Sequence, residues 1–191
     1  MPNDSSTAGY LSPIAPLSLE DQALGDFLQQ IVVGIVGLPG NLVFQRWQPE
    51  PPNTPNFGTD WAAVGDTARD RDTFVSVTHS ADGDTSKRNE RITVLASFYG
   101  PNARGNAEKL AMGLLVSQNR ELMIAQGYNL VEILDPVITA DLFNERWVPR
   151  VDQPLKLVRG VTYTYPVLDL LGAQVEAIPS DGEPIQIDTG E

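Results

Sequence analysis

Apolar residues near the start of the chain recur at the spacing of an amphipathic helix. From Leu24 to Ile35 they fall on one helical face. The preceding Ser18-Leu19-Glu20-Asp21 has the form of a capping box with Ser18 as the N-cap. Because Pro39-Gly40 cannot continue a helix, we expect this one to end near Gly37 and a short strand to follow over residues 41–47.

A second pattern, in the middle of the chain, predicts a strand, a sharp turn, one long helix and another strand. Gly100-Pro101 ends an apolar run, and residues 107–125 carry apolar side chains at helical spacing. Gly127 stands where a left-handed C-cap is expected, and residues 128–134 resume as a strand. The side chains that we expect to pack the two helices on a sheet are Leu24, Phe27, Ile31, Leu110, Leu114, Leu115 and Leu122.

Other patterns predict further strands. Residues 73–79 and 91–98 flank a turn at Asp82-Gly83, and residues 147–171 are typical of a final hairpin that turns at Arg159-Gly160. We expect a loop with a short helical turn at residues 136–144 and a last strand at residues 174–178.

The fold class that follows is α+β, with a mostly antiparallel sheet and two amphipathic helices packed on it. We expect a single domain with an irregular Pro-rich loop. The predicted divisions of the chain are a flexible N-terminal arm, this α+β domain and an acidic C-terminal tail, at residues 1–17, 18–178 and 179–191.

Residues 48–72 form the irregular region of the sequence. Prolines stiffen its first half, and a loop of this length inside a compact domain is commonly functional. Its aromatic side chains would be costly to expose in a monomer, so they either fold back on their own core or anchor a contact between subunits. The residues that we expect at such a contact are Trp47, Phe57, Trp61, Arg69, Arg71 and Trp147.

The residues available for chemistry argue against an enzyme. The chain has no cysteine and one histidine, His79, which excludes disulfides, thiolate zinc sites and cysteine nucleophiles and disfavours a histidine metal cluster. The glycines at 34, 37 and 40 lack the spacing of a dinucleotide-binding loop, and residues 82–86 lack the ligands of a calcium loop. We therefore expect no catalytic residue, no metal and no cofactor.

The distribution of charge and hydropathy argues against nucleic acid and membrane as binding partners. The formal net charge is −12, and no Lys or Arg follows Arg159. Such a chain repels nucleic-acid phosphates. The excess of acidic residues therefore either keeps the protein soluble or forms a surface along which DNA passes without binding. The longest apolar run, residues 31–38, is too short to span a bilayer, and the N-terminus lacks a signal pattern, so we expect a protein made in the cytosol with no membrane partner.

The order of these elements resembles the neck or tail-terminator proteins of tailed bacteriophages over residues 19–178. The resemblance is carried by the entry helix and by four local sequences: residues 46–53, Ser97-Phe98-Tyr99-Gly100-Pro101-Asn102-Ala103, Gln118-Asn119-Arg120 and Arg146-Trp147-Val148-Pro149-Arg150. It implies a small α+β subunit that forms a ring, usually a hexamer, which caps the tail tube and joins it to the head connector. It carries no catalytic residues onto this chain, and the Ser/Pro-rich arm and acidic extension depart from it.

The same resemblance implies the partners. These are further copies of the chain, the tail tube protein and head–tail connector or sheath proteins, with genomic DNA passing through the lumen without specific binding. The protein would be made in the host cytoplasm and end in the virion. Within such a ring we expect Asp82, Asp84 and Glu90 to line the lumen, the alternative being that they face solvent outside.

Two other functions stay open. One is a soluble protein-binding module, such as a chaperone or an inhibitor, that acts through residues 48–72. The other is a hydrolase whose site has no recognisable pattern.

Overall fold

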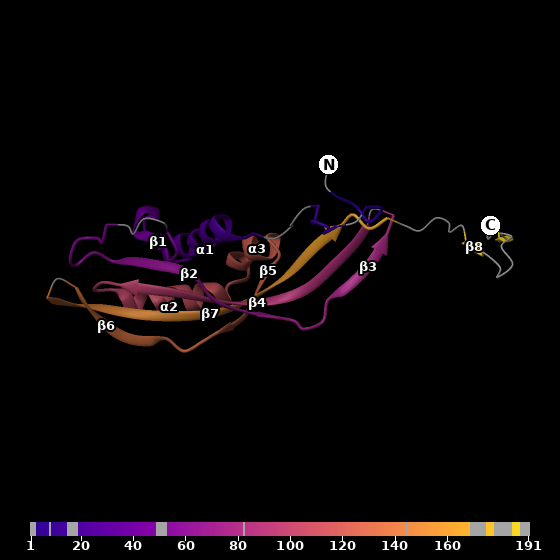
Figure 1. Ribbon diagram of the computed structural model, residues 1–191. Helices are drawn as coiled ribbons and strands as arrows, with labels where there is room; N and C mark the ends of the chain where they lie inside the picture. Colours follow the sequence, from indigo (N-terminus) through magenta and orange to yellow (C-terminus); the bar gives the residue numbers. More distant parts are fainter. Residues whose placement is uncertain are drawn as a thin grey trace. The chain divides into compact units, whose positions relative to one another are not determined.

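Three α-helices and a mixed, mostly antiparallel sheet of seven strands form the fold of the described chain (Figure 1). The computed structural model describes residues 3–7, 9–14, 19–48, 53–81, 83–143, 145–168, 175–177 and 185–187. Its helices are α1 (Asp21–Val36), α2 (Ala103–Leu115) and α3 (Ser117–Ala125). The strands of the large sheet are β1 (Val43–Gln45), β2 (Trp61–Arg71), β3 (Ser76–Ser80), β4 (Gly83–Tyr99), β5 (Tyr128–Ile133), β6 (Val137–Phe143) and β7 (Arg146–Tyr165). This is the predicted fold class.

The large sheet has the strand order β1-β2-β4-β7-β5, with β3 paired to β4 and β6 paired to β7. β1 is parallel to β2, whereas β2 with β4, β5 with β7 and β6 with β7 are antiparallel pairs. A register shift between Asp66 and Ala68 marks a bulge in β2. Two short strands, β8 (Val175–Ala177) and β9 (Ile185–Ile187), pair with each other. β8 falls within the predicted last strand.

The chain divides into two compact units. Residues 17–76 and 87–162 form the larger unit, which contains the helices and most of the large sheet. Residues 1–16, 77–86 and 163–191 form the smaller one. Both β4 and β7 contribute residues to each unit.

In the smaller unit, the start of β4 lies against the end of β7. Gly83 has a φ of +120°, and a Cβ at this position would lie 2.2 Å from the carbonyl oxygen of Tyr165. Only glycine fits this combination of backbone conformation and close approach. In the same unit, the Ile14 amide donates a hydrogen bond of 2.8 Å to the carbonyl oxygen of Thr164.

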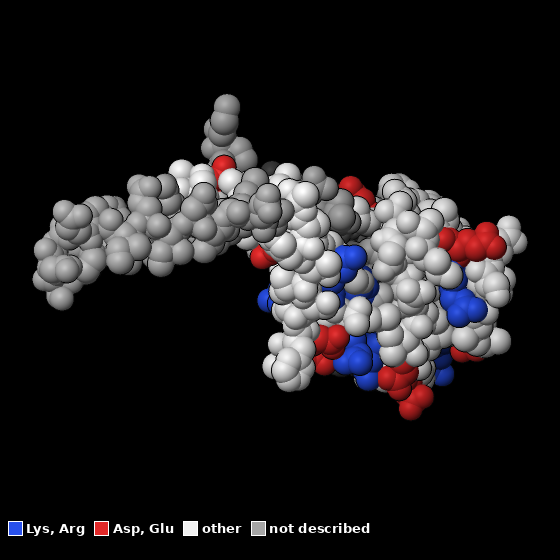
Figure 2. Space-filling view, turned by 90° about the vertical axis from the view of Figure 1, so that its right-hand side faces the viewer, with Lys and Arg blue, Asp and Glu red and all other residues white. Residues whose placement is uncertain are grey.

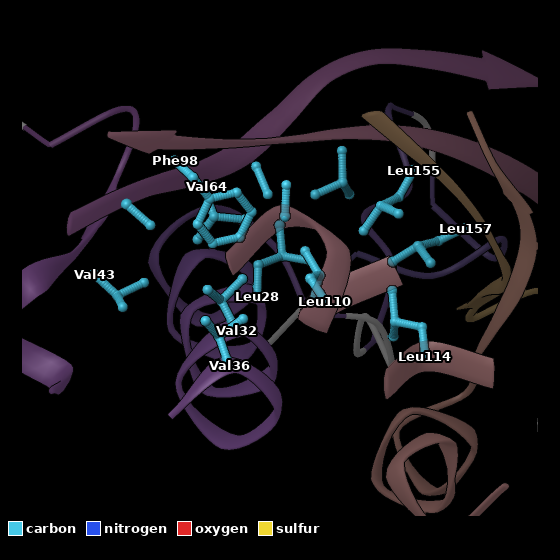
Figure 3. Packing of buried hydrophobic residues seen from close by; sticks show 14 of the residues in the cluster. Leu28, Val32, Val36, Val43, Val64, Phe98, Leu110, Leu114, Leu155 and Leu157 are labelled. Carbon is cyan, nitrogen blue, oxygen red and sulfur yellow. The ribbon is translucent and has the colours of Figure 1, made fainter. Parts of the chain in front are cut away.

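The core of the larger unit lies between the sheet and the helices. Figure 3 shows α1 and α2 on the same side of the strands, with apolar side chains directed toward them. The helical spacing of these residues and the alternation along β4 supply the two faces of the core. Side chains at most 2% exposed in this core include Leu24, Leu28, Val32, Ile92, Val94, Ala96, Phe98, Leu110 and Leu114. The predicted packing of Leu24, Phe27, Leu110 and Leu114 is confirmed, and Ile31 is partly buried against the core.

The predicted long helix is wrong in one respect, because it breaks at Val116. This residue is extended, with φ −74° and ψ 124°, and it separates α2 from α3. The Gly113 carbonyl accepts two hydrogen bonds at the break, from the Val116 amide at 3.2 Å and from the Asn119 side-chain amide at 2.9 Å. Leu115, on the outer face of α2, and Leu122, in α3, are 57% and 75% exposed, contrary to the prediction. Gly127 does take the predicted left-handed conformation, with φ +79°.

The predicted loop over residues 48–72 is also wrong in its second half. From Trp61 to Arg71 the chain is the strand β2, which pairs with β4 over its whole length. Small residues hide the alternation that would have indicated a strand. Gly65 is needed there, because a Cβ would lie 2.9 Å from the Cβ of Arg46.

Two predictions about the end of the chain are wrong as well. Residues 136–144 contain the strand β6 instead of a loop with a helical turn, and the predicted hairpin is one continuous strand, β7. Gly160 does not take the positive φ that a tight turn would require. At the start of the chain, α1 begins at Asp21 with Glu20 at the N-cap, and Ser18 lies outside the described residues. α1 ends at the predicted Gly37, with φ +80°.

Candidate assembly surfaces

An aromatic stack lies on the face of the sheet turned away from α1 and α2. Trp61 and Tyr99 alternate with core residues along β2 and β4 and are directly opposed in the register of the two strands. Their rings are stacked, with centroids 3.8 Å apart and 4° between the planes. Phe44 of β1 lies edge-on to Trp61 at 5.7 Å. Trp61 therefore folds back on its own chain.

A cavity of about 500 Å³ opens beside this stack. Trp61 and Tyr99 form part of its wall, together with residues of β6 and β7 and the segment 54–57. The Arg146 guanidinium lies 5.1 Å from the centroid of the Phe57 ring, so a cation–π contact holds this segment to β7. Phe57 nevertheless remains 64% exposed. The cavity thus exposes aromatic surface.

The polar groups near the cavity are balanced in charge. Arg150 binds Asp152 at 2.8 Å and Asp141 at 3.1 Å, and its guanidinium lies 5.6 Å from the centroid of Tyr99. The hydrogen bond with Asp152 raises the pKa of Arg150 against the opposing effect of burial. Burial raises the pKa of Tyr99. Both groups therefore keep their protons at neutral pH.

A second apolar surface lies on β6 and the start of β7. Leu142 and Trp147 are directly opposed in the strand register and share one face of the sheet. Ile138 is opposed to Val151, whose side chain is buried, so it lies on that face too. We call Ile138, Leu142 and Trp147 the β6 patch; their exposed fractions are 56%, 62% and 67%.

An ion-pair cluster is buried at the other end of the larger unit. The side chains of Arg159 and Glu90 are each 2% exposed, and Nη2 lies 2.6 Å from Oε2. Arg159 also donates to the Tyr128 hydroxyl at 2.8 Å and pairs with Glu20, while Arg71 binds the second oxygen of Glu90 at 2.8 Å. Burial acts to raise the pKa of Glu90, but hydrogen bonds from Arg71 and Arg159 outweigh it, and the pKa lies below its ordinary value. Buried Glu90 cannot line a lumen, so this expectation is wrong.

The residues predicted for a subunit contact lie in different places. Phe57 and Trp61 meet at the cavity, whereas Trp147 belongs to the β6 patch. Trp47 is 71% exposed and donates its indole N–H to the Asp66 carbonyl at 2.8 Å. Sequence reasoning missed Tyr99, Arg150 and β6. The β-branched and aromatic residues within 137–143 could have indicated the strand β6.

The charged residues singled out in the sequence are largely occupied within the chain. Arg69 pairs with Glu20 at 2.7 Å and with Asp66 at 2.9 Å. Asp84 pairs with His79, and Asp82 lies outside the described residues. Figure 2 shows basic and acidic side chains next to each other on the face in view, without a separate patch of either sign.

The described residues lack two kinds of site. No helix among them is long and apolar enough to cross a membrane. No group of three or more His, Asp or Glu side chains among them is arranged to hold a metal ion.

The sheet exposes aromatic and apolar surfaces, and its buried charged groups are paired within the chain. These features are typical of a protein that binds other proteins. A sequence model of the phage neck terminator protein family matches residues 22–183, and the chain belongs to this family. No curated protein matches it. The protein is therefore a structural, non-enzymatic component of the virion, as the sequence resemblance predicted. Membership implies assembly with tail and neck components.

Proposed function

We propose that the protein forms a ring at the neck of the virion, in six copies, which terminates the tail tube and joins it to the head connector. Its partners are further copies of the chain, the tail tube protein, and connector or sheath proteins. Family membership carries the proposal. It is supported by the β6 patch, because apolar side chains more than half exposed in one place are typical of a surface that another subunit covers.

We also propose that genomic DNA passes through the ring without specific binding. Acidic residues exceed basic ones by 25 to 13, and Arg69, Arg71, Arg150 and Arg159 are already paired with carboxylates of the same chain. The excess of carboxylates repels phosphates instead of holding them. Asp84 stays a proposed lumen residue. Asp84→Lys should make DNA retention in the particle stronger and salt-sensitive, and unchanged ejection would place Asp84 outside the lumen.

The experiment that tests the ring is mass measurement combined with imaging. Analytical ultracentrifugation of the full chain should give a species of six times 20.8 kDa, and electron microscopy of particles should place it at the end of the tail tube. A chain that is monomeric in solution and does not form a ring at the neck would contradict the proposal.

The second candidate is a protein-binding module, favoured by the cavity beside Trp61 and Tyr99. It would use the segment 54–57, which lies within the region named in the sequence. Phe57→Ala separates the two functions. If the variant loses a bound partner but still forms rings, the cavity serves the partner; if it loses the ring, the cavity belongs to the subunit contact.

A further inference from the structure

The strands at the margins of the large sheet differ in how they are protected. A free strand edge pairs readily with another chain, and proteins prevent this with short strands, bulges or charges. β1 has only three residues, and the Gln29 side-chain amide donates to the Val43 carbonyl at 2.5 Å. β5 has a register irregularity between Leu130 and Glu132. Both strands are therefore protected.

β6 has none of these devices. It pairs with β7 through seven successive residue pairs without an irregularity, and its sequence contains neither Lys nor Pro. Its one charged residue, Asp141, is bound by Arg150 at 3.1 Å. Within the described chain, β7 is the only strand paired with β6. The backbone N–H and C=O groups on its other side are thus available to a further strand.

The side chains of β6 make the same edge apolar. Ile138 and Leu142 belong to the β6 patch, and Val137, on the opposite face, is 57% exposed. A segment with high β-propensity, little charge and no proline aggregates when its edge stays free. We therefore expect another strand to cover this edge.

Among the described strands, β3 has a second edge of this kind, since β4 is the only strand that pairs with it there. All five residues of β3 are exposed, with Val77 59% exposed. Phe74 and Val75, just before the strand, are 89% and 46% exposed. β3 likewise contains neither Lys nor Pro, and in Figure 1 it lies on one side of β4 with the end of β7 on the other.

Two different open edges on one chain are the elements of a head-to-tail contact. Such a contact repeats from copy to copy and gives a ring when the rotation between copies closes, whereas pairing of one edge with itself gives a two-fold dimer and stops. We propose that the β6 edge of one copy binds the β3 edge of the next by strand addition, and that this contact links the subunits of the ring. The inference rests on the proposed function, and it names the surface through which the ring forms.

Disulfide trapping tests the contact directly, because the natural chain has no cysteine. The full chain carrying both Thr78→Cys in β3 and Ala140→Cys in β6 should give a ladder of covalent multimers on mild oxidation. The matched control pairs Thr78→Cys with Asn129→Cys on the protected edge of β5, and it should give none. If the chain with Ala140→Cys alone gives a covalent dimer, β6 pairs with itself, and this result would overturn the inference.

Charge substitution gives an independent test. Ile138→Lys with Leu142→Lys should abolish the ring species while leaving the thermal midpoint of unfolding unchanged, whereas Val131→Lys, on β5, should leave the ring intact. Suppose that the wild-type chain forms a ring, the β6 lysine variant forms it too, and the cysteine pair gives no ladder. This result would refute the contact between β6 and β3 but leave the proposed ring intact. A wild-type chain that forms no ring, alone or in particles, would refute both proposals.

Discussion

Replacing Arg159 with methionine should destabilise the fold severely, because it leaves the carboxylate of Glu90 buried with a single partner. Glu90 would keep the Arg71 contact at 2.8 Å and lose both bonds from Arg159, at 2.6 and 2.9 Å. Breaking a buried pair by removing one partner costs about 3–5 kcal/mol. Since domains of this kind are stable by about 5–15 kcal/mol, Arg159→Met should remove a large part of the free energy of unfolding.

A double-mutant cycle separates the loss of a pair from the loss of packing. In Arg159→Met with Glu90→Leu, no unpaired carboxylate remains, and Tyr128 can still donate to the Leu19 carbonyl at 3.3 Å. The double variant should therefore be more stable than Arg159→Met alone, by about 2 kcal/mol. Urea unfolding followed by circular dichroism measures all four corners of the cycle. Additive losses in the two single variants would refute the account of this cluster as a coupled buried pair.

Three further predictions concern packing, backbone and pH. Leu114→Ala should lower the free energy of unfolding by about 2–5 kcal/mol, and Leu115→Ala, one residue further, by less than about 1, in urea titrations; equal losses would contradict the orientation of α2. Gly83→Ala should speed amide hydrogen exchange at the start of β4, because the added Cβ would clash with the carbonyl oxygen of Tyr165, while Gly160→Ala, whose added Cβ has open space, should not. The pKa of Glu90 is lowered on folding, so its contribution to stability is present above its unfolded pKa, about 4.3, and is lost as pH falls through the folded value. The variant with both Glu90→Leu and Arg159→Met should therefore lose less stability on acidification than the wild type, in urea titrations at several pH values; an equal loss would argue against this.

The sequence predicted those elements whose pattern is local. The spacing of Leu24, Leu28 and Val32 determines α1, and Gly37 and Gly127 end helices by a left-handed conformation that glycine adopts without strain. The helix-facing half of the core follows from the same periodicity. These features depend on residues within a turn or two of each other, which a single sequence displays.

The errors come from contacts between distant segments. Arg159-Gly160 is typical of a turn, but Arg159 is buried in mid-strand by Glu90, 69 residues away in sequence. β2 was not predicted because its small residues give no clear alternation of apolar and polar side chains, and Gly65 is needed there by the close approach of Arg46. The cavity could not be predicted for a related reason: Trp61 and Tyr99 meet only through the register of β2 on β4.

The three tryptophans lie in different surroundings, and this gives the protein an optical signal of its own assembly. Trp61 is stacked on Tyr99 inside one subunit, so its emission should stay constant when subunits meet. Trp147, 67% exposed in the β6 patch, should shift its emission to shorter wavelength as the patch is covered. Trp47 is also exposed, and Trp47→Phe removes its contribution. Ring formation can then be followed in real time without a label.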